Sequence, residues 1–310
     1  MEDWLKTTSP ALRMMLVLLM IPAAARAADE WQVGTAPSFS SGKYGTDTRT
    51  EVLYTSIAAR RLFNDADLTL VFPVTCIWGS AVTIVNGSPI PTERTQAAGA
   101  TTSTTPTRGG QTTPTRGGTT TPSRTTPSQT TADVAAAAGT DIAPSTVSAC
   151  GMGDIVVRGR YYLVDEHAWA PTVALRAHLK APTADAERGL GTGRPDEGVG
   201  LEISRTFGRG FMAMVDGGYT VIGQPTGVEY NDNWWYDVGV AQNLGSDAVN
   251  LSVFFSEYRA IVPGLANARD ILVALNVKGA SGWRIQISGE KGLSDGSPDH
   301  GITFGAARRF

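Results

Sequence analysis

The feature that most constrains the fold is an alternation of apolar and polar residues at every second position, which recurs along the chain. In residues 172–181, Leu175 and Leu179 fall on one face, while Arg176 and His178 fall on the other. Successive side chains of a β-strand point to opposite faces, so this period predicts strands with one apolar and one polar face. Twelve segments follow the pattern: 31–44, 48–63, 68–78, 154–165, 172–181, 199–207, 211–221, 234–242, 249–258, 271–278, 283–290 and 301–310.

The connections between these segments alternate in length. Short connections follow the even-numbered segments, at 64–66, 165–167, 208–210, 245–247 and 280–282. Longer connections rich in Gly, Pro and Asp follow the odd-numbered segments, with the brief 45–47 as the exception. Transmembrane β-barrels combine an even strand number with tight periplasmic turns and long external loops. The sequence therefore predicts an all-β fold, an antiparallel transmembrane β-barrel of about twelve strands.

The two faces of the predicted strands support a membrane barrel. One face is aliphatic, and the other carries Arg, Lys, Asp and Glu, which a wet lumen accommodates more easily than a dry core. Aromatic residues near the predicted strand ends are Trp31, Trp78, Trp169, Trp234, Trp283 and Phe310. We expect them to form girdles at the membrane interfaces, with chance placement as the alternative.

The first residues predict export. An apolar run of twelve residues, 14–25, follows Lys6 and Arg13 and precedes an Ala-Arg-Ala sequence. As a helix it would span about 18 Å, short of the roughly 30 Å of a hydrocarbon core. We therefore expect a signal peptide at 1–27 and a barrel at 28–310, with a buried core helix as the alternative.

Residues 80–150 interrupt the strand pattern. Thr-Pro-Thr-Arg and Thr-Pro-Ser-Arg repeats recur at a spacing of about eight residues. This low-complexity composition cannot form a packed core, so we expect a disordered external loop between the third and fourth strands. It either binds a partner, carries sugars or is a tolerated expansion. Cys76 and Cys150 flank the insert, and we expect a disulfide there, with two buried thiols as the alternative.

Charged residues on the polar faces are candidates for lining a pore. They are Arg158, Arg160, Arg176, His178, Lys180, Glu202, Asp216 and Asp237. Glu202 and Asp216 lie equally far from the turn at Arg209, so they should face each other, with Asp237 beside them and Arg176 as a bridge. The set forms either a salt-bridge network that stiffens or plugs the lumen, or a constriction with opposed basic and acidic walls.

Three stretches carry a resemblance to a known family: 41–54, 68–75 and the start of the fourth strand at 151–163. Their Gly-x-Gly-Asp motif at Gly151, Gly153 and Asp154 is similar to that of bacterial outer-membrane proteins grouped as the MetA pathway of phenol degradation. The Thr-rich insert departs from that family. The resemblance implies an outer-membrane barrel linked to movement of small compounds, including hydrophobic or aromatic ones, and it supplies no catalytic residues.

The composition argues against several other classes of function. A formal charge of −3 argues against a nucleic-acid partner. Two cysteines and three histidines leave little for a metal centre, and Glu202 with Asp216 are too few ligands for Ca²⁺. An outer-membrane hydrolase is the enzymatic alternative, but no Ser/His signature surrounds His178. A surface-display or adhesin-type barrel is the structural one.

We therefore predict a porin-like channel in the bacterial outer membrane for passive passage of small molecules, without an enzyme activity or a cofactor. The expected partners are outer-membrane lipid and lipopolysaccharide, a small-molecule solute, and the barrel-assembly machinery. That machinery recognises terminal aromatic residues on strands, and the chain ends at Phe310.

Overall fold

The computed structural model describes residues 30–45, 49–79, 82–85, 88–91, 148–208, 210–245 and 248–310. The predicted signal peptide and most of the predicted disordered insert lie outside these residues. In the part of the chain that is described, no helix is long and apolar enough to cross a membrane.

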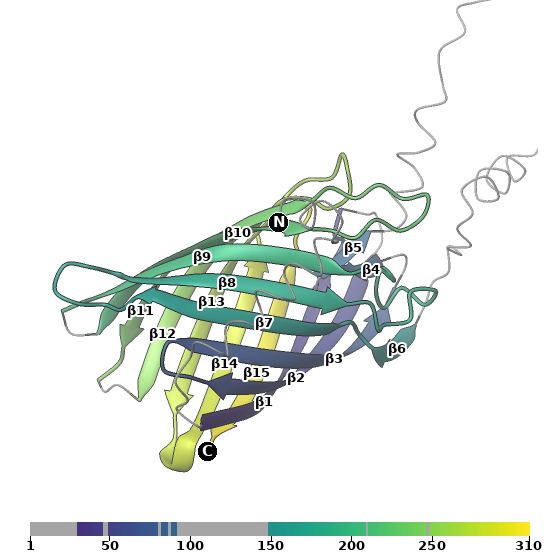
Figure 1. Cartoon of the computed structure of the whole chain (residues 1–310). Helices are drawn as coiled ribbons and strands as arrows, with labels where there is room; N and C mark the ends of the chain where they lie inside the picture. The colour runs from purple at the N-terminus through teal and green to yellow at the C-terminus, as the bar shows by residue number, and fades with distance from the viewer. Residues whose placement is uncertain are drawn as a thin grey trace, which may run out of the picture.

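The described residues form a closed antiparallel β-barrel (Figure 1). Its wall consists of β1 (Glu30–Gly42), β2 (Thr50–Leu62), β3 (Ala66–Trp78), β7 (Ile155–Val164), β8 (Thr172–Ala181), β9 (Asp196–Phe207), β10 (Phe211–Val221), β11 (Asn233–Asn243), β12 (Val249–Tyr258), β13 (Ala268–Lys278), β14 (Trp283–Gly292) and β15 (His300–Arg309). The short β6 (Ala149–Met152) continues β7 along β3, and a single 3₁₀ turn, η1 (Ala280–Gly282), joins β13 to β14. The prediction of twelve wall strands is confirmed.

The first and last strands close the barrel. β1 pairs with β2 on one side and with β15 on the other. At the end of this seam, Trp31 and Phe310 exchange two backbone hydrogen bonds, each 2.9 Å long. Closure matters because a sheet edge in lipid would leave backbone N–H and C=O groups without partners.

The exposure of side chains follows the predicted alternation. Leu175 is 41% exposed, Val199 52% and Val273 44%, whereas the intervening Ala174 and Ser252 are nearly inaccessible. The outward positions of the wall are thus aliphatic, as expected for strands that face lipid. The prediction that the apolar faces point outward is confirmed.

Most exposed aromatic side chains lie at the two ends of the barrel, while Phe304, 53% exposed, lies in the middle of β15. At the end with the short turns they are Trp31, Trp169, Phe207, Phe211, Trp283 and Phe310, and at the other end Trp78, Tyr219 and Trp234. This arrangement matches the two girdles predicted for the membrane interfaces.

The connections alternate in length as predicted. Long loops at 182–195, 222–232, 259–267 and 293–299 lie at one end, and the tight turns at 63–65, 208–210 and 279–282 lie at the other. The connection at 165–171 is longer than the three residues predicted. It folds back onto β9, where the Glu166 carboxylate accepts hydrogen bonds from the Thr206 N–H at 3.0 and 3.1 Å, and the Arg205 guanidinium donates to the carbonyls of Ala168 and Trp169.

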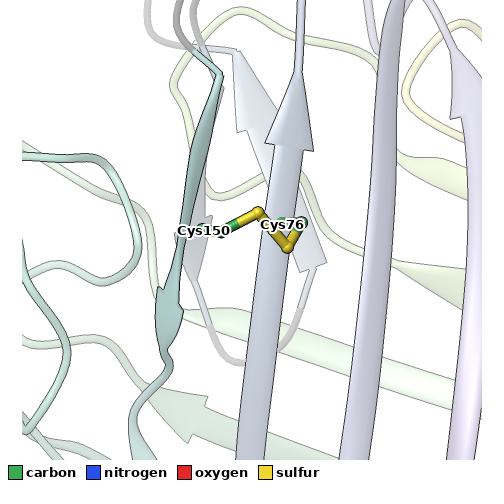
Figure 2. Close-up of a disulfide and its surroundings, with 2 residues drawn as sticks. All are labelled: Cys76 and Cys150. Atoms are coloured by element: carbon green, nitrogen blue, oxygen red, sulfur yellow. A yellow bond between two sulfur atoms is a disulfide. The ribbon is translucent and has the colours of Figure 1, made fainter.

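A disulfide joins Cys76 on β3 to Cys150 on β6, as predicted (Figure 2). The two residues are directly opposite in the antiparallel register, with their Cα atoms 4.1 Å apart. The bond therefore crosses neighbouring strands at the base of the insert. It closes a loop of 74 residues in the sequence.

The insert also contains a hairpin that the sequence analysis missed. Its strands are β4 (Val82–Val85) and β5 (Ser88–Pro91), which, within the described ranges, pair with each other and not with the barrel wall. The sequence does hold a signal for it, because Asn-Gly between two β-prone runs favours a tight hairpin.

We expect replacement of both cysteines by alanine to lower the free energy of unfolding by about 2–4 kcal/mol, because the bond restricts a long loop in the unfolded chain. Urea unfolding of the protein refolded in vesicles, followed by tryptophan fluorescence, measures the change. The reduced wild type should unfold like the variant. Equal midpoints for the oxidised wild type and the variant would contradict the prediction.

Candidate functional site: the charged lumen

A cavity of about 650 Å³ lies inside the barrel. Residues of nearly every wall strand line it, which places it in the lumen rather than between the barrel and a loop. Its polar lining includes Arg60, Asp67, Arg158, Arg160, Arg176, His178, Asp237, Asp270 and Glu290. The cavity is thus bordered by charged groups of both signs.

The basic groups gather on one side, over β2, β7 and β8. Arg158 lies directly opposite His178 in the strand register, and Arg160 lies opposite Arg176. Arg60 forms an ion pair with Asp67 at 2.5 Å. Arg158 makes no ion pair with any residue in the described ranges, and it is exposed to the lumen.

A row of carboxylates crosses the neighbouring strands. Asp216 lies directly opposite Glu202 on one side and Asp237 on the other, as the sequence predicted. Glu202 and Asp216 are only 8% and 5% exposed. Neither lines the cavity itself, whereas Asp237 does.

Two arginines neutralise the buried carboxylates. Arg160 lies 3.2 Å and Arg176 3.9 Å from the Glu202 carboxylate, and Arg176 also forms an ion pair with Asp216. Two like charges in register repel unless a positive group lies near them. Arg176 therefore occupies the bridging position that the sequence predicted for it.

The remaining acidic groups lie on the opposite side of the lumen. Asp237, Asp270 and Glu290 line the cavity from β11, β13 and β14. Asp237 accepts a hydrogen bond from the Tyr258 hydroxyl at 3.3 Å. None of the three forms an ion pair within the part of the chain that the structure describes. Sequence reasoning missed Asp270 and Glu290, although both occupy inward positions of the alternation.

The sequence analysis also missed Trp235, which lines the cavity beside the predicted girdle residue Trp234. The Arg176 guanidinium lies 5.5 Å from the centre of its ring. Gly200 and Gly218 accept the indole, since a Cβ atom built on either one would lie 3.1 or 2.8 Å from Trp235. Small residues at these inward positions are the signal that could have revealed it.

Lys180 occupies a separate, buried site near the end of the barrel that carries the long loops. It is 1% exposed and does not line the cavity. Its ammonium lies 2.7 Å from Asp196 and 3.3 Å from Asp154, and it donates to the Thr192 hydroxyl at 3.0 Å. Asp154 also accepts from the backbone N–H of Ala184 at 2.9 Å. The cluster thus fastens the 182–195 loop to the wall.

The long loops narrow the outer mouth of the lumen. Ile222, Ile261 and Val262 form a buried apolar cluster, against which Tyr230 packs. Burial raises the pKa of Tyr230 to about 12, so its hydroxyl stays neutral at physiological pH. Tyr44, in the first loop, has its pKa raised to about 12 by the same cause. The loops therefore present apolar and neutral tyrosine side chains at the mouth, together with the charged Arg259, which lines the cavity beside Ile261.

His178 contacts a threonine hydroxyl, and within the described part of the chain it forms no hydrogen bond with a serine. Its Nε2 lies 3.4 Å from the Thr220 hydroxyl oxygen, and Gly198 leaves room for its ring. Within the described ranges, no group of three or more His, Cys, Asp and Glu residues is arranged to hold a metal ion. The contacts of His178 are those of a residue packed against the wall.

A closed barrel with a lipid-facing aliphatic exterior, aromatic girdles and a charged lumen is an outer-membrane β-barrel. The family described as "Putative MetA-pathway of phenol degradation" matches residues 87–310. The chain belongs to this family. No curated protein sequence matches the chain.

Solved structures are similar to the chain at low sequence identity, and the first of those given below shares its fold. An outer membrane channel from Pseudomonas putida F1 is 11% identical with a TM-score of 0.58, over 92% of this chain and 97% of that one. The KdgM porin in complex with disordered oligogalacturonate is 5% identical with a TM-score of 0.42, over 90% and 98% of the two chains. The CymD monoaromatic hydrocarbon channel is 8% identical with a TM-score of 0.41, over 96% and 91%.

Replacing Lys180 with Met should lower the free energy of unfolding by about 3–5 kcal/mol, because it leaves two buried carboxylates without their cation. The same replacement at the exposed Lys278 is the matched control and should change stability by less than about 0.5 kcal/mol. Urea unfolding in vesicles measures both. Adding Asp196→Asn to the Lys180 variant should restore part of the loss, and equal effects at the two lysines would contradict this account.

Proposed function

We propose that the protein is a channel for passive passage of small molecules across the bacterial outer membrane. The observation that carries the proposal is the lumenal cavity of about 650 Å³, bordered by Arg158 on one side and Asp237, Asp270 and Glu290 on the other. Opposed charges across a lumen create a transverse field that orients polar solutes and selects between ions. The shared fold with a solved outer membrane channel is consistent with this role.

The lining favours solutes that are small and partly apolar. Ile261, Val262 and Leu265 line the cavity from one of the long loops, and Trp235 lines it from the wall. Pockets that combine apolar and aromatic walls with a few polar groups suit small organic molecules. We therefore propose small hydrophobic or aromatic compounds as the solutes.

We assign pore-lining roles to the charged residues that form no ion pair among the described residues. Arg160, Arg176, Glu202 and Asp216 neutralise one another, so in this proposal they stiffen the wall. Arg158 and the acids across from it would set the field in the lumen. This division combines the two interpretations that the sequence left open.

Single-channel conductance of the refolded protein in planar bilayers tests the proposal. We expect discrete steps with a preference for cations, because three lumenal carboxylates lack a paired cation among the described residues. The triple variant Asp237→Asn, Asp270→Asn and Glu290→Gln should shift the reversal potential in a salt gradient toward anions. Arg158→Gln should shift the reversal potential in the opposite direction, toward stronger cation selectivity.

Lys291→Gln, at an exposed position on the outward face of β14, is the control and should leave the selectivity unchanged. Heat-modifiable migration on a gel verifies that each variant is folded. Absence of conductance from a folded wild-type barrel would overturn the proposal of an open channel. Surface display or enzyme activity would then be the functions to test.

Neither alternative function gains support from a specific contact. A hydrolase needs a nucleophile and a base within hydrogen-bonding reach, and among the described residues the hydroxyl that contacts the His178 ring is that of Thr220, at 3.4 Å. An adhesin would act through the insert, most of which lies outside the described residues. The channel is therefore the function that the lumen supports best.

We propose in addition that Phe310 is recognised by the barrel-assembly machinery, and that lipid and lipopolysaccharide surround the folded wall. Phe310 is 66% exposed at the end of β15, on the outer surface of the closing seam. A terminal aromatic side chain that stays accessible on the last strand supports such recognition.

Deletion of Phe310 should lower the amount of folded protein in the outer membrane several-fold, whereas Phe310→Trp should leave it nearly unchanged. Heat-modifiable protein in outer-membrane fractions measures the effect. Purified protein refolded without the machinery is the control, because both variants should refold there. If the deletion also prevents unassisted refolding, the residue acts through closure of the seam instead.

A further inference from the structure

Arginine side chains lie over aromatic rings on the outer surface of the barrel, at the end with the short turns. The Arg61 guanidinium lies 5.5 Å from the ring centre of Trp31 and 5.3 Å from that of Phe63. The Arg308 guanidinium lies 5.9 Å from the ring centre of Trp283. Cations over aromatic faces are held in place by the ring quadrupole.

These residues form one continuous patch across the closing seam. The strands follow one another around the wall in the order β14, β15, β1 and β2. Arg61 lies directly opposite Trp31, and Arg308 directly opposite Trp283. Trp31 and Phe310 connect the two pairs through their backbone hydrogen bonds. We call Trp31, Arg61, Trp283, Arg308 and Phe310 the seam patch.

The seam patch faces lipid rather than the lumen. Trp31 is 40% exposed, Trp283 46% and Phe310 66%. Arg309, which lies between Arg308 and Phe310 in the sequence, points to the inner side of the wall, where it forms an ion pair with Glu30. The two arginines of the patch therefore lie among the exposed girdle residues.

The opposite rim has a different chemistry. There, the Tyr219 hydroxyl donates to Asp232 and the Tyr236 hydroxyl to Glu257, each at 2.9 Å. Among the described residues, the remaining arginine–aromatic pairs are Arg205 with Phe207, at the same rim as the patch, and Arg176 with Trp235 in the lumen. Outward arginine–aromatic pairs are thus confined to the rim with the short turns, which in outer-membrane barrels faces the periplasm.

We propose that the seam patch binds the headgroup of an anionic phospholipid from the periplasmic leaflet. Girdle aromatics lie at the level of the lipid headgroups. Arginine binds phosphate oxygens through two parallel N–H donors, and basic groups near a membrane surface attract anionic lipids. Phosphate oxygens would accept from Arg61 and Arg308, while the rings of Trp31 and Trp283 contact the glycerol and upper acyl region. The inference is independent of the proposed channel function.

The test compares the full chain refolded in vesicles of phosphatidylcholine with and without phosphatidylglycerol. We expect phosphatidylglycerol to raise the urea midpoint of the wild type and high salt to reduce that increase. The double variant Arg61→Gln and Arg308→Gln should lose the increase. Arg158→Gln, which removes a lumenal arginine, should keep it. A double variant that keeps the full increase would overturn the proposal.

Two further measurements test whether the planar arginine donors matter and whether a free anion can replace the lipid. Arg61→Lys with Arg308→Lys keeps the charge but not the planar donors, so it should retain part of the increase and remains available if the glutamine variant does not fold. Inorganic phosphate added to phosphatidylcholine vesicles should have no effect. If free phosphate raises the midpoint as much as the lipid does, the patch is an anion site and not a headgroup site.

Discussion

The structure depends on the requirement that no backbone hydrogen-bonding group be left without a partner in lipid. A bilayer offers no water to an open sheet edge, so a sheet can cross it only when its first strand pairs with its last. Here that pairing is between β1 and β15, and it ends at the hydrogen bonds between Trp31 and Phe310. Because side chains alternate, each strand's register also decides which residues face lipid and which face the lumen.

Register therefore governs the electrostatics of the lumen. It places Glu202 opposite Asp216 and brings Arg160 and Arg176 alongside them from β7 and β8. Carboxylates this buried are stable only when a cation compensates them, so these four groups serve the wall. Charges left outside that arrangement, such as Arg158, are the ones exposed to solutes. In this view, the ion-paired charges of the lumen stabilise the wall, and the unpaired charges act on solutes in the proposed transport.

Features that depend on strand pairing could be predicted from the sequence, because spacing from a tight turn defines the register. The facing of Glu202 and Asp216 across the turn at 208–210 follows in this way. The disulfide between Cys76 and Cys150 was predicted on a different ground, namely that the two cysteines flank the insert. Burial of Lys180 could not be predicted, since it shares the parity of Arg176 and differs only because the 182–195 loop folds over it. Loop folding depends on distant contacts that alternation does not encode.

Dependence on contacts between distant residues also explains why Trp235 was not predicted to line the lumen. Alternation places Trp235 inward, but only its exposed neighbour Trp234 was assigned a role, as a girdle residue. Its position depends on Gly200 and Gly218, which lie on other strands and leave space for the indole. Apolar side chains of the 259–267 loop line the cavity at the mouth, and Trp235 lies beside Arg176 deeper in the wall, so the proposed pathway offers both apolar and charged contacts within one cavity. An amphipathic solute would make favourable contacts of both kinds, whereas a hydrated ion would lose part of its hydration beside the apolar side chains.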